Sequence, residues 1–192
     1  MLFRSRCPEV ELRQGDAQAL PFEDAAFDAV VNNFGLLHLP DAERAFAEAA
    51  RVLKSGGRFA FTVWGNAAES PGAKILDEAL KGANLSVPVP QGPDHLRHGR
   101  IDDWRRILGA AGFDPASTNI SLERAEWEMP TDFFLFEAQR HAGVRIAALL
   151  EAQTPDVLSA IERAMTVGVR AYAKDDGYAV PYAAWVVSVR KV

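Results

Sequence analysis

FDAVVNNFGLLHLPDAERAFAEAARVLKSGGRFAFTVW, residues 27–64, is the stretch that decides the fold. It begins with a nearly continuous apolar run over 27–33, the pattern of a parallel strand that is covered on both faces. Asp41 then precedes apolar residues at helical spacing, and RFAFTVW at 58–64 predicts a second buried strand. A strand, a helix and a strand with short links form a right-handed crossover unit, so the two strands are expected to be parallel neighbours.

The rest of the chain continues this alternation of strands and helices, which favours an α/β layer architecture over a bundle or a sandwich. The segment over 65–100 contains a connection rich in Pro and Gly, and long connections of this kind are often lids. We expect a single domain over residues 1–192. Its other predicted elements are strands over 10–13, 117–122 and 182–189, a helix within 65–82, and helices that begin near Asp102, Thr131 and Thr154.

The composition bounds the functions that are open to the chain. With 192 residues, 48% of them hydrophobic, the chain can bury a real core. A formal net charge of -5 argues against nucleic-acid binding, which needs a clustered cationic surface. No apolar run approaches the ~20 residues of a membrane helix. Because the start of the chain also has no signal-peptide block, we expect no membrane contact and a cytoplasmic location.

Cysteine and histidine usage points to no disulfide and no metal. Cys7 is the one cysteine, so it cannot form an internal disulfide. His95 and His98 lie three residues apart in the Pro-rich loop, and we expect no metal site there.

Four consecutive segments of the first 64 residues carry a family resemblance. GDAQALPFEDAAFDAVV at 15–31, NNFGLLHLPD at 32–41, RVLKSGGRF at 51–59 and FAFTVW at 59–64 resemble, in order and spacing, the later motifs of class I S-adenosylmethionine-dependent methyltransferases. This broad group of small-molecule methylases includes the ubiquinone and menaquinone methyltransferases. The resemblance implies a Rossmann-like class I methyltransferase fold, with strand order 3-2-1-4-5-7-6 in a mostly parallel sheet and an antiparallel C-terminal strand.

The same resemblance implies a set of site residues for S-adenosylmethionine. Asp16 would accept a hydrogen bond from the adenine amino group, and the backbone of Ala17 would contact the ring edge. Asn33, with Phe34 beside it, would approach the methionine portion, and His38 would face the mouth of the cleft. His38 or His141 is the candidate catalytic base for an acceptor that must lose a proton. Plainer interpretations stay open: Asp16 forms a turn, Asn33 satisfies backbone groups at a strand end, and His38 is an ordinary polar loop residue.

The family's glycine-rich turn is absent from this sequence, which contains no Gly-x-Gly. Met1 matches an internal position of the family, so we expect a partial domain that lacks the first two strands and their helices. Residues 1–64 would form its cofactor side, and 65–100 and 123–173 its substrate or lid segments. The strand over 27–33 would then recruit a second copy or another chain, pair with a displaced 10–13 strand, or leave an aggregation-prone edge.

Two functions from different classes follow. The first is methyl transfer from S-adenosylmethionine to a small-molecule acceptor, a reaction that depends on alignment and exclusion of water more than on charged side chains. The second is a non-catalytic methyltransferase-like remnant that acts as a partner-binding or regulatory subunit. A nicotinamide dehydrogenase is less suited, because its glycine fingerprint is also absent.

Overall fold

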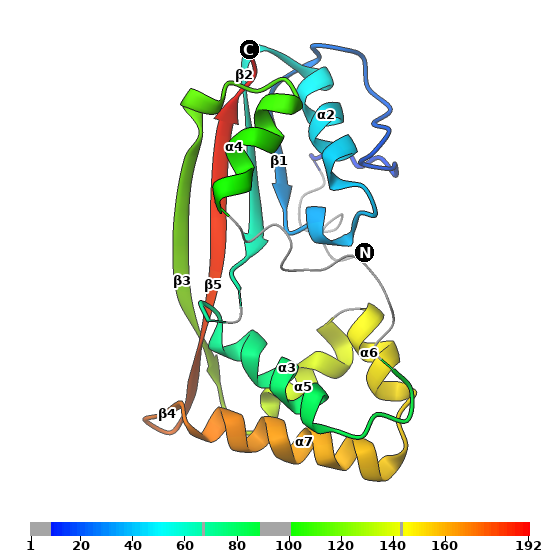
Figure 1. Cartoon of the computed structure of the whole chain (residues 1–192), viewed down its shortest axis with the longest axis vertical. Helices are drawn as coiled ribbons and strands as arrows, with labels where there is room; N and C mark the ends of the chain where they lie inside the picture. The colour runs from blue at the N-terminus through cyan, green and yellow to red at the C-terminus, as the bar shows by residue number, and fades with distance from the viewer. Residues whose placement is uncertain (1–8, 67, 89–100, 143) are drawn as a thin grey trace.

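A single mixed sheet is the centre of the molecule (Figure 1). The computed structural model describes residues 9–66, 68–88, 101–142 and 144–192. Within these ranges the sheet order is β1-β2-β5-β3, and the short β4 pairs with β5. The strands are β1 (Phe27–Asn33), β2 (Leu53–Trp64), β3 (Asn119–Met129), β4 (Ala173–Lys174) and β5 (Gly177–Arg190).

The strand directions confirm the expected topology. β1 and β2 are parallel, with Val31 beside Ala60, as the crossover pattern predicts. β5 is antiparallel to both β2 and β3, so β1, β2 and β3 run in one direction and the C-terminal strand runs in the other. This order corresponds to the last four strands, 4-5-7-6, of the order that the resemblance implies.

The helices form two groups at opposite ends of the sheet (Figure 1). The helix predicted after Asp41 is confirmed: the Asp41 side chain accepts a hydrogen bond from the Arg44 backbone N–H at 3.0 Å, which satisfies one free donor of the first turn. The sequence did not predict α6. The helices are α2 (Ala42–Val52), α3 (Pro71–Gly82), α4 (Ile101–Ala110), α5 (Phe134–Ala142), α6 (Val144–Glu151) and α7 (Pro155–Arg170), with 3-10 turns η1 (Leu36–His38) and η2 (Pro115–Ser117).

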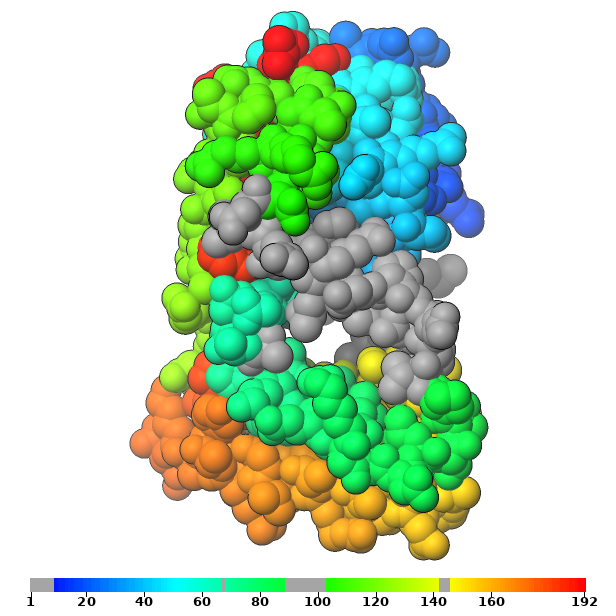
Figure 2. All heavy atoms as spheres, viewed as in Figure 1, coloured from blue at the N-terminus to red at the C-terminus, as the bar shows by residue number. Residues whose placement is uncertain are grey.

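Each helix group has its own hydrophobic core. In the first core, Phe46 of α2 and Trp104 of α4 pack against Phe59 and Phe61 of β2. In the second core, α3, α5, α6 and α7 pack around residues such as Ile161 at the other end of the long strands β3 and β5. The space-filling view shows α3 and α7 together at that end (Figure 2). The carboxyl ends of β1 and β2 point toward this helical layer (Figure 1).

Alternation along the strands places only one sheet face against α2 and α4. Phe59 and Phe61 of β2 point into the first core, so Ala60, Thr62 and Trp64 project from the opposite face. We call this opposite face, which also carries Val31 of β1, the outer face. Val31 is 74% exposed, so the prediction that β1 is covered on both faces is wrong for the described residues.

The predicted strand over 10–13 is also wrong. These residues belong to no strand, and Val10 and Leu12 are 43% and 37% exposed. Among the strands of the described residues, β1 is therefore paired only with β2, and its other edge is open. Of the three outcomes expected for this edge, pairing with a displaced 10–13 strand does not occur.

Candidate functional site

The first part of the site is the turn that follows β1. Thr62 lies beside Asn33 in the parallel ladder, and its hydroxyl donates to the Asn33 side-chain oxygen at 2.6 Å. The same hydroxyl oxygen accepts the Phe34 backbone N–H at 3.0 Å. Phe34 has a φ of 54°, a left-handed conformation that costs a residue other than glycine about 1–3 kcal/mol. Two polar contacts therefore hold a strained residue at the carboxyl end of β1.

Asn32 closes the turn from inside. Its side-chain oxygen accepts the backbone N–H groups of Gly35 at 2.8 Å and Leu36 at 3.1 Å. A Cβ on Gly35 would lie 2.8 Å from that oxygen, so the glycine is explained by the approach of Asn32. The sequence prediction named Asn33 but missed Asn32, although asparagine is a typical turn residue because its side chain bonds nearby backbone groups.

The second part of the site is the turn at Asp16. One Asp16 oxygen accepts both the Gln18 backbone N–H at 2.9 Å and the Gln18 side-chain amide at 3.1 Å. These hydrogen bonds, the backbone one above all, lower the pKa of the Asp16 carboxyl, so the group is an ionised acceptor at neutral pH. The plain interpretation of Asp16 as a turn residue is thus confirmed. Ala17 is half-buried against the first core.

Gln18 attaches this turn to the start of α2. Its side-chain oxygen accepts the Asp41 backbone N–H at 2.9 Å, and its backbone oxygen accepts the Arg44 Nε–H at 2.9 Å. Because α2 begins where the chain returns from the carboxyl end of β1, these bonds hold the Asp16 turn at that end of the sheet. Sequence reasoning missed Gln18, since its partners lie 23 and 26 residues away.

Arg51 of α2 holds the rest of the segment between the Asp16 turn and β1 in place through hydrogen bonds. Its guanidinium donates to the Leu20 and Phe22 carbonyl oxygens at 2.9 and 2.8 Å and to the Asp24 carboxylate at 2.7 Å. The Glu48 carboxylate accepts from the same guanidinium and, at 2.7 Å, from the Leu20 backbone N–H. Bonding to Arg51 lowers the pKa of Glu48. The acidic turn after Pro21, which contains Asp24, is therefore attached to α2 through Arg51.

The structure gives His38 no catalytic geometry of its own. It ends η1, its side chain is exposed, and its backbone N–H donates to the Gly35 carbonyl oxygen at 3.1 Å. His95 and His98 lie outside the described residues. In the described part of the chain, no group of three or more His, Cys, Asp or Glu side chains is placed to hold a metal ion. None of the described helices is long and apolar enough to cross a bilayer.

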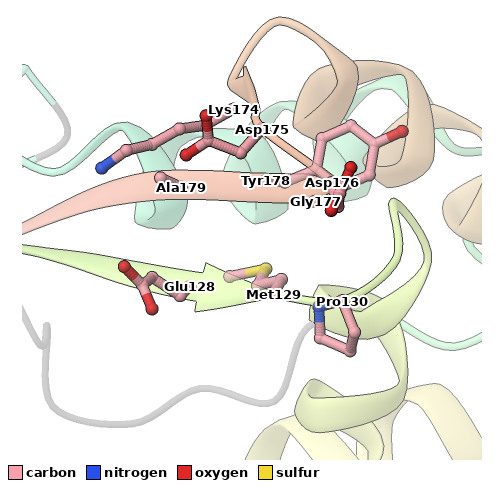
Figure 3. Close-up of a pocket in the computed structure, with 9 residues that line it drawn as sticks. All are labelled: Glu128, Met129, Pro130, Lys174, Asp175, Asp176, Gly177, Tyr178 and Ala179. Carbon is pink, nitrogen blue, oxygen red and sulfur yellow. The ribbon is translucent and has the colours of Figure 1, made fainter.

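A surface hollow of about 410 Å³ lies far from these turns, where the end of β3 meets the β4–β5 turn (Figure 3). Its lining contains none of the predicted site residues. Gly177 approaches the backbone there, since a Cβ would lie 2.6 Å from the Met129 carbonyl oxygen. We place the candidate site at the carboxyl ends of β1 and β2 instead, because the turn at Asn33 and Phe34 and the turn at Asp16 both lie there.

Sheet order, strand directions and the placement of the two turns define a Rossmann-like α/β fold of the class I methyltransferase type. Residues 2–61 match the family described as Methyltransferase domain. A Bacillus halodurans protein described as a methyltransferase superposes with a TM-score of 0.55 at 19% identity, over 96% of this chain and 78% of that one. The YcgJ protein of Bacillus subtilis gives a TM-score of 0.50 at 18% identity, over 100% and 76%.

Sequence relatives agree with the fold. The uncharacterized methyltransferase YcgJ of Bacillus subtilis is 32% identical over 121 residues, which is 62% of this chain and 45% of that protein. The ubiquinone/menaquinone biosynthesis C-methyltransferase UbiE of a Caulobacter species is 52% identical over 123 residues, 61% of this chain and 47% of that protein. The chain is thus similar to methyltransferases in the sequence of its first part and in its fold, and it spans less than half the length of these two relatives.

Proposed function

We propose that this chain takes part in methyl transfer from S-adenosylmethionine to a small-molecule acceptor, and that the turns at Asp16 and Asn33 form one wall of the cofactor site. The observation that carries the proposal is the attachment of the Asp16 turn to α2 through Gln18. It brings an ionised acceptor to the end of the sheet where ligands of open α/β folds bind.

The residues present fit the adenosine end of this cofactor. A carboxylate has about four acceptor sites, and Gln18 directs its two shorter bonds at one Asp16 oxygen, while the other oxygen has only a 3.3 Å contact. That second oxygen can accept a charge-assisted bond from an adenine amino group. Ala17 would offer its backbone beside it, and Asn33 and Phe34 would face the methionine end. When bound, the cofactor supplies a methyl group activated by a positive sulfur.

The chain's own residues would bind and orient rather than transfer protons. Methyl transfer needs the acceptor atom aligned with the methyl group and water excluded. His38 is the proposed base only for an acceptor that must lose a proton. The relative named as a C-methyltransferase of ubiquinone/menaquinone biosynthesis supports a carbon atom as the acceptor. The cytoplasmic location stays a prediction.

Calorimetric titration of the chain with S-adenosylmethionine tests the cofactor wall. Asp16→Asn should weaken binding by about tenfold or more, because a charge-assisted hydrogen bond is lost. Asp28→Asn is the matched control: Asp28 is an exposed carboxylate at the opposite end of β1, paired with Lys54 at 2.8 Å. Absence of binding to the wild-type chain, or equal effects of the two substitutions, would refute the proposal.

A second candidate function is supported by the open edge of β1. An edge strand with free backbone groups and an exposed apolar side chain is a template for a further strand. Val31 provides such a side chain, and no other strand of the described residues pairs with that edge. The alternative role is therefore a partner-binding subunit, and we propose a second copy of this chain as the partner.

Light scattering with chemical crosslinking tests this alternative. A charge on an edge strand opposes edge-to-edge pairing, so Val31→Lys should convert a wild-type dimer into a monomer. Val167→Lys is the control, because Val167 is also an exposed valine, 64% accessible, but lies on α7. A wild-type chain that stays monomeric at high concentration would rule out self-association.

A further inference from the structure

The outer face of the sheet presents small, uncharged side chains where β1, β2 and β5 adjoin. They are Ala29 and Val31 of β1, Ala60 of β2, and Val186 and Ser188 of β5, and we call them the outer patch. None of the five is buried, and Val31 is 74% exposed. The described helices that pack on β1 and β2, α2 and α4, lie on the other face, so the outer patch is an unpartnered surface of the described sheet.

Two arginines lie at one end of the outer patch. Arg58 and Arg190 are directly opposite each other in the antiparallel ladder of β2 and β5, and strand alternation puts both exposed side chains on the outer face. Like charges in this arrangement repel each other. Within the described residues neither guanidinium forms an ion pair, and Arg190 has only a 3.4 Å contact with the Gly56 carbonyl oxygen. The pair is therefore a local positive charge without a described counter-charge.

Trp64 and the first turn of α3 limit the outer patch at its other end. The Trp64 ring lies 5.9 Å from that of Tyr182, and Gly72 of α3 packs directly against Tyr182. From Arg58 to Trp64 the strand covers about 20 Å at roughly 3.3 Å per residue. A helix of about 13 residues, with a rise of about 1.5 Å each, has the same length. The uncovered surface between the arginines and α3 thus matches a helix of about four turns.

A helix is the element that suits this surface. Parallel strands are normally covered by helices on both faces, and the parallel pair of β1 and β2 has such cover on one face only. An amphipathic helix buries its apolar stripe against another layer, and the small side chains of the outer patch leave room for it. The last carbonyl oxygens of a helix lack partners and carry a partial negative charge. The C-terminal end of a helix therefore complements the positive charge of Arg58 and Arg190.

We propose that the outer patch docks an amphipathic helix of a separate polypeptide, about four turns long, whose acidic C-terminal end lies at Arg58 and Arg190. The apolar face of that helix covers Val31, and its carboxylates supply the counter-charge for the two guanidinium groups. This docking needs no cofactor. It uses side chains on the face of the sheet, whereas the addition of a strand uses the backbone groups at the open edge of β1.

Fluorescence anisotropy of the full chain with two synthetic helices of about 14 residues tests the docking. Both peptides have one face of Ala and Leu and one face of Gln, and a side-chain lactam holds them helical, because isolated helices this short are marginal in water. One peptide ends in two Glu residues and a free carboxylate, and the other ends in two Gln residues and an amide. We expect the acidic peptide to bind about tenfold more tightly, and this difference to shrink as salt screens the charges.

Variants of the arginine pair and of the outer patch locate the bound helix. The double variant Arg58→Gln, Arg190→Gln should abolish the preference for the acidic peptide. Val31→Asn should weaken both peptides by about fivefold or more, because apolar contact is lost. Arg163→Gln and Val167→Asn are the matched controls at exposed positions of α7, and each should change the dissociation constants by less than about twofold. Circular dichroism checks that each variant is folded.

Three results would overturn the proposal. The first is absence of binding, or equal binding of the two peptides by the wild-type chain. The second is an equal loss of binding with the α7 controls. The third is a wild-type dimer in light scattering that the double arginine variant converts to a monomer, which would identify a second copy as the occupant of the outer patch. Because no S-adenosylmethionine is present, none of these results bears on the cofactor test.

Discussion

Gly72 decides how α3 packs on the sheet, and its replacement by alanine should be destabilising. Gly72 is buried in the first turn of α3, where a Cβ would lie 2.5 Å from the Tyr182 hydroxyl oxygen and still closer to its ring. The ring cannot turn aside freely, because Trp64 and Trp127 lie on either side of it. Overpacking of this kind costs about 1–3 kcal/mol, so Gly72→Ala should lower the free energy of unfolding by that amount.

The sign of this effect should reverse when the ring is removed. Alanine stabilises a helix relative to glycine by about 0.5–1 kcal/mol, because glycine loses more backbone entropy on folding. In a Tyr182→Val background the clash is absent, so Gly72→Ala should become stabilising by this smaller amount. The two substitutions therefore form a double-mutant cycle with a coupling of about 2 kcal/mol.

Urea unfolding followed by circular dichroism measures the four corners of the cycle. Gly82→Ala is the matched control, since Gly82 ends the same helix and a Cβ at this position would meet no atom within 4 Å. It should be neutral or stabilising in both backgrounds. If Gly72→Ala stabilises the wild-type chain, or has the same sign in both backgrounds, the packing of α3 on Tyr182 is not as described.

Three further outcomes are expected. Ser70→Ala should lower the free energy of unfolding in urea by about 1–3 kcal/mol, because the buried Ser70 hydroxyl bonds both the N–H and the carbonyl oxygen of Ala183. Burial raises the pKa of Tyr182 to about 12. The stability that the neutral Tyr182 side chain contributes is therefore full below its ordinary pKa near 10 and is lost as pH rises toward 12. Urea unfolding midpoints of the wild-type chain and of Tyr182→Phe, measured across this pH range, detect the loss. Gln18→Ala should raise the pKa of Asp16, measured by carbon NMR, but not fully to its ordinary value, because the hydrogen bond from the residue 18 backbone N–H remains. In the wild-type chain, the stability that comes from the lowered Asp16 pKa is present above about pH 4 and is lost as pH falls.

The central part of the fold could be predicted because its signals are local. Asp41 caps α2 within three residues, and the apolar spacing of α2 and the run of β2 need only neighbouring positions to be recognised. The strand predicted over 10–13 failed for the opposite reason. Alternating apolar residues such as Val10 and Leu12 become a strand only when another strand bonds to them, and the described chain offers none.

The site was predicted less completely, because its polar residues act over long separations. The acidic residue at 16 and the asparagine at 33 stand in recognisable motifs. Gln18, Thr62 and Arg51 do not, because the partners that connect them to other elements lie 23 to 31 residues away. Only after β1, α2 and β2 are placed side by side do these three side chains define the turns. Residue type and spacing could not reveal them.

β1 is uncovered in two ways: one of its edges pairs with no other described strand, and Val31 on its outer face is exposed. An apolar run in the sequence predicts a buried strand, but it does not show which segment packs against each face of that strand. Val31 is oriented by its ladder position beside Ala60, away from the first core, so no rearrangement of α2 or α4 can bury it without breaking the parallel pairing. Burial of apolar surface is worth about 25 cal/mol per Å², and a one-residue register shift would expose Val30 instead. Cover for Val31 must therefore come from something other than α2 and α4, such as a further strand at the open edge of β1.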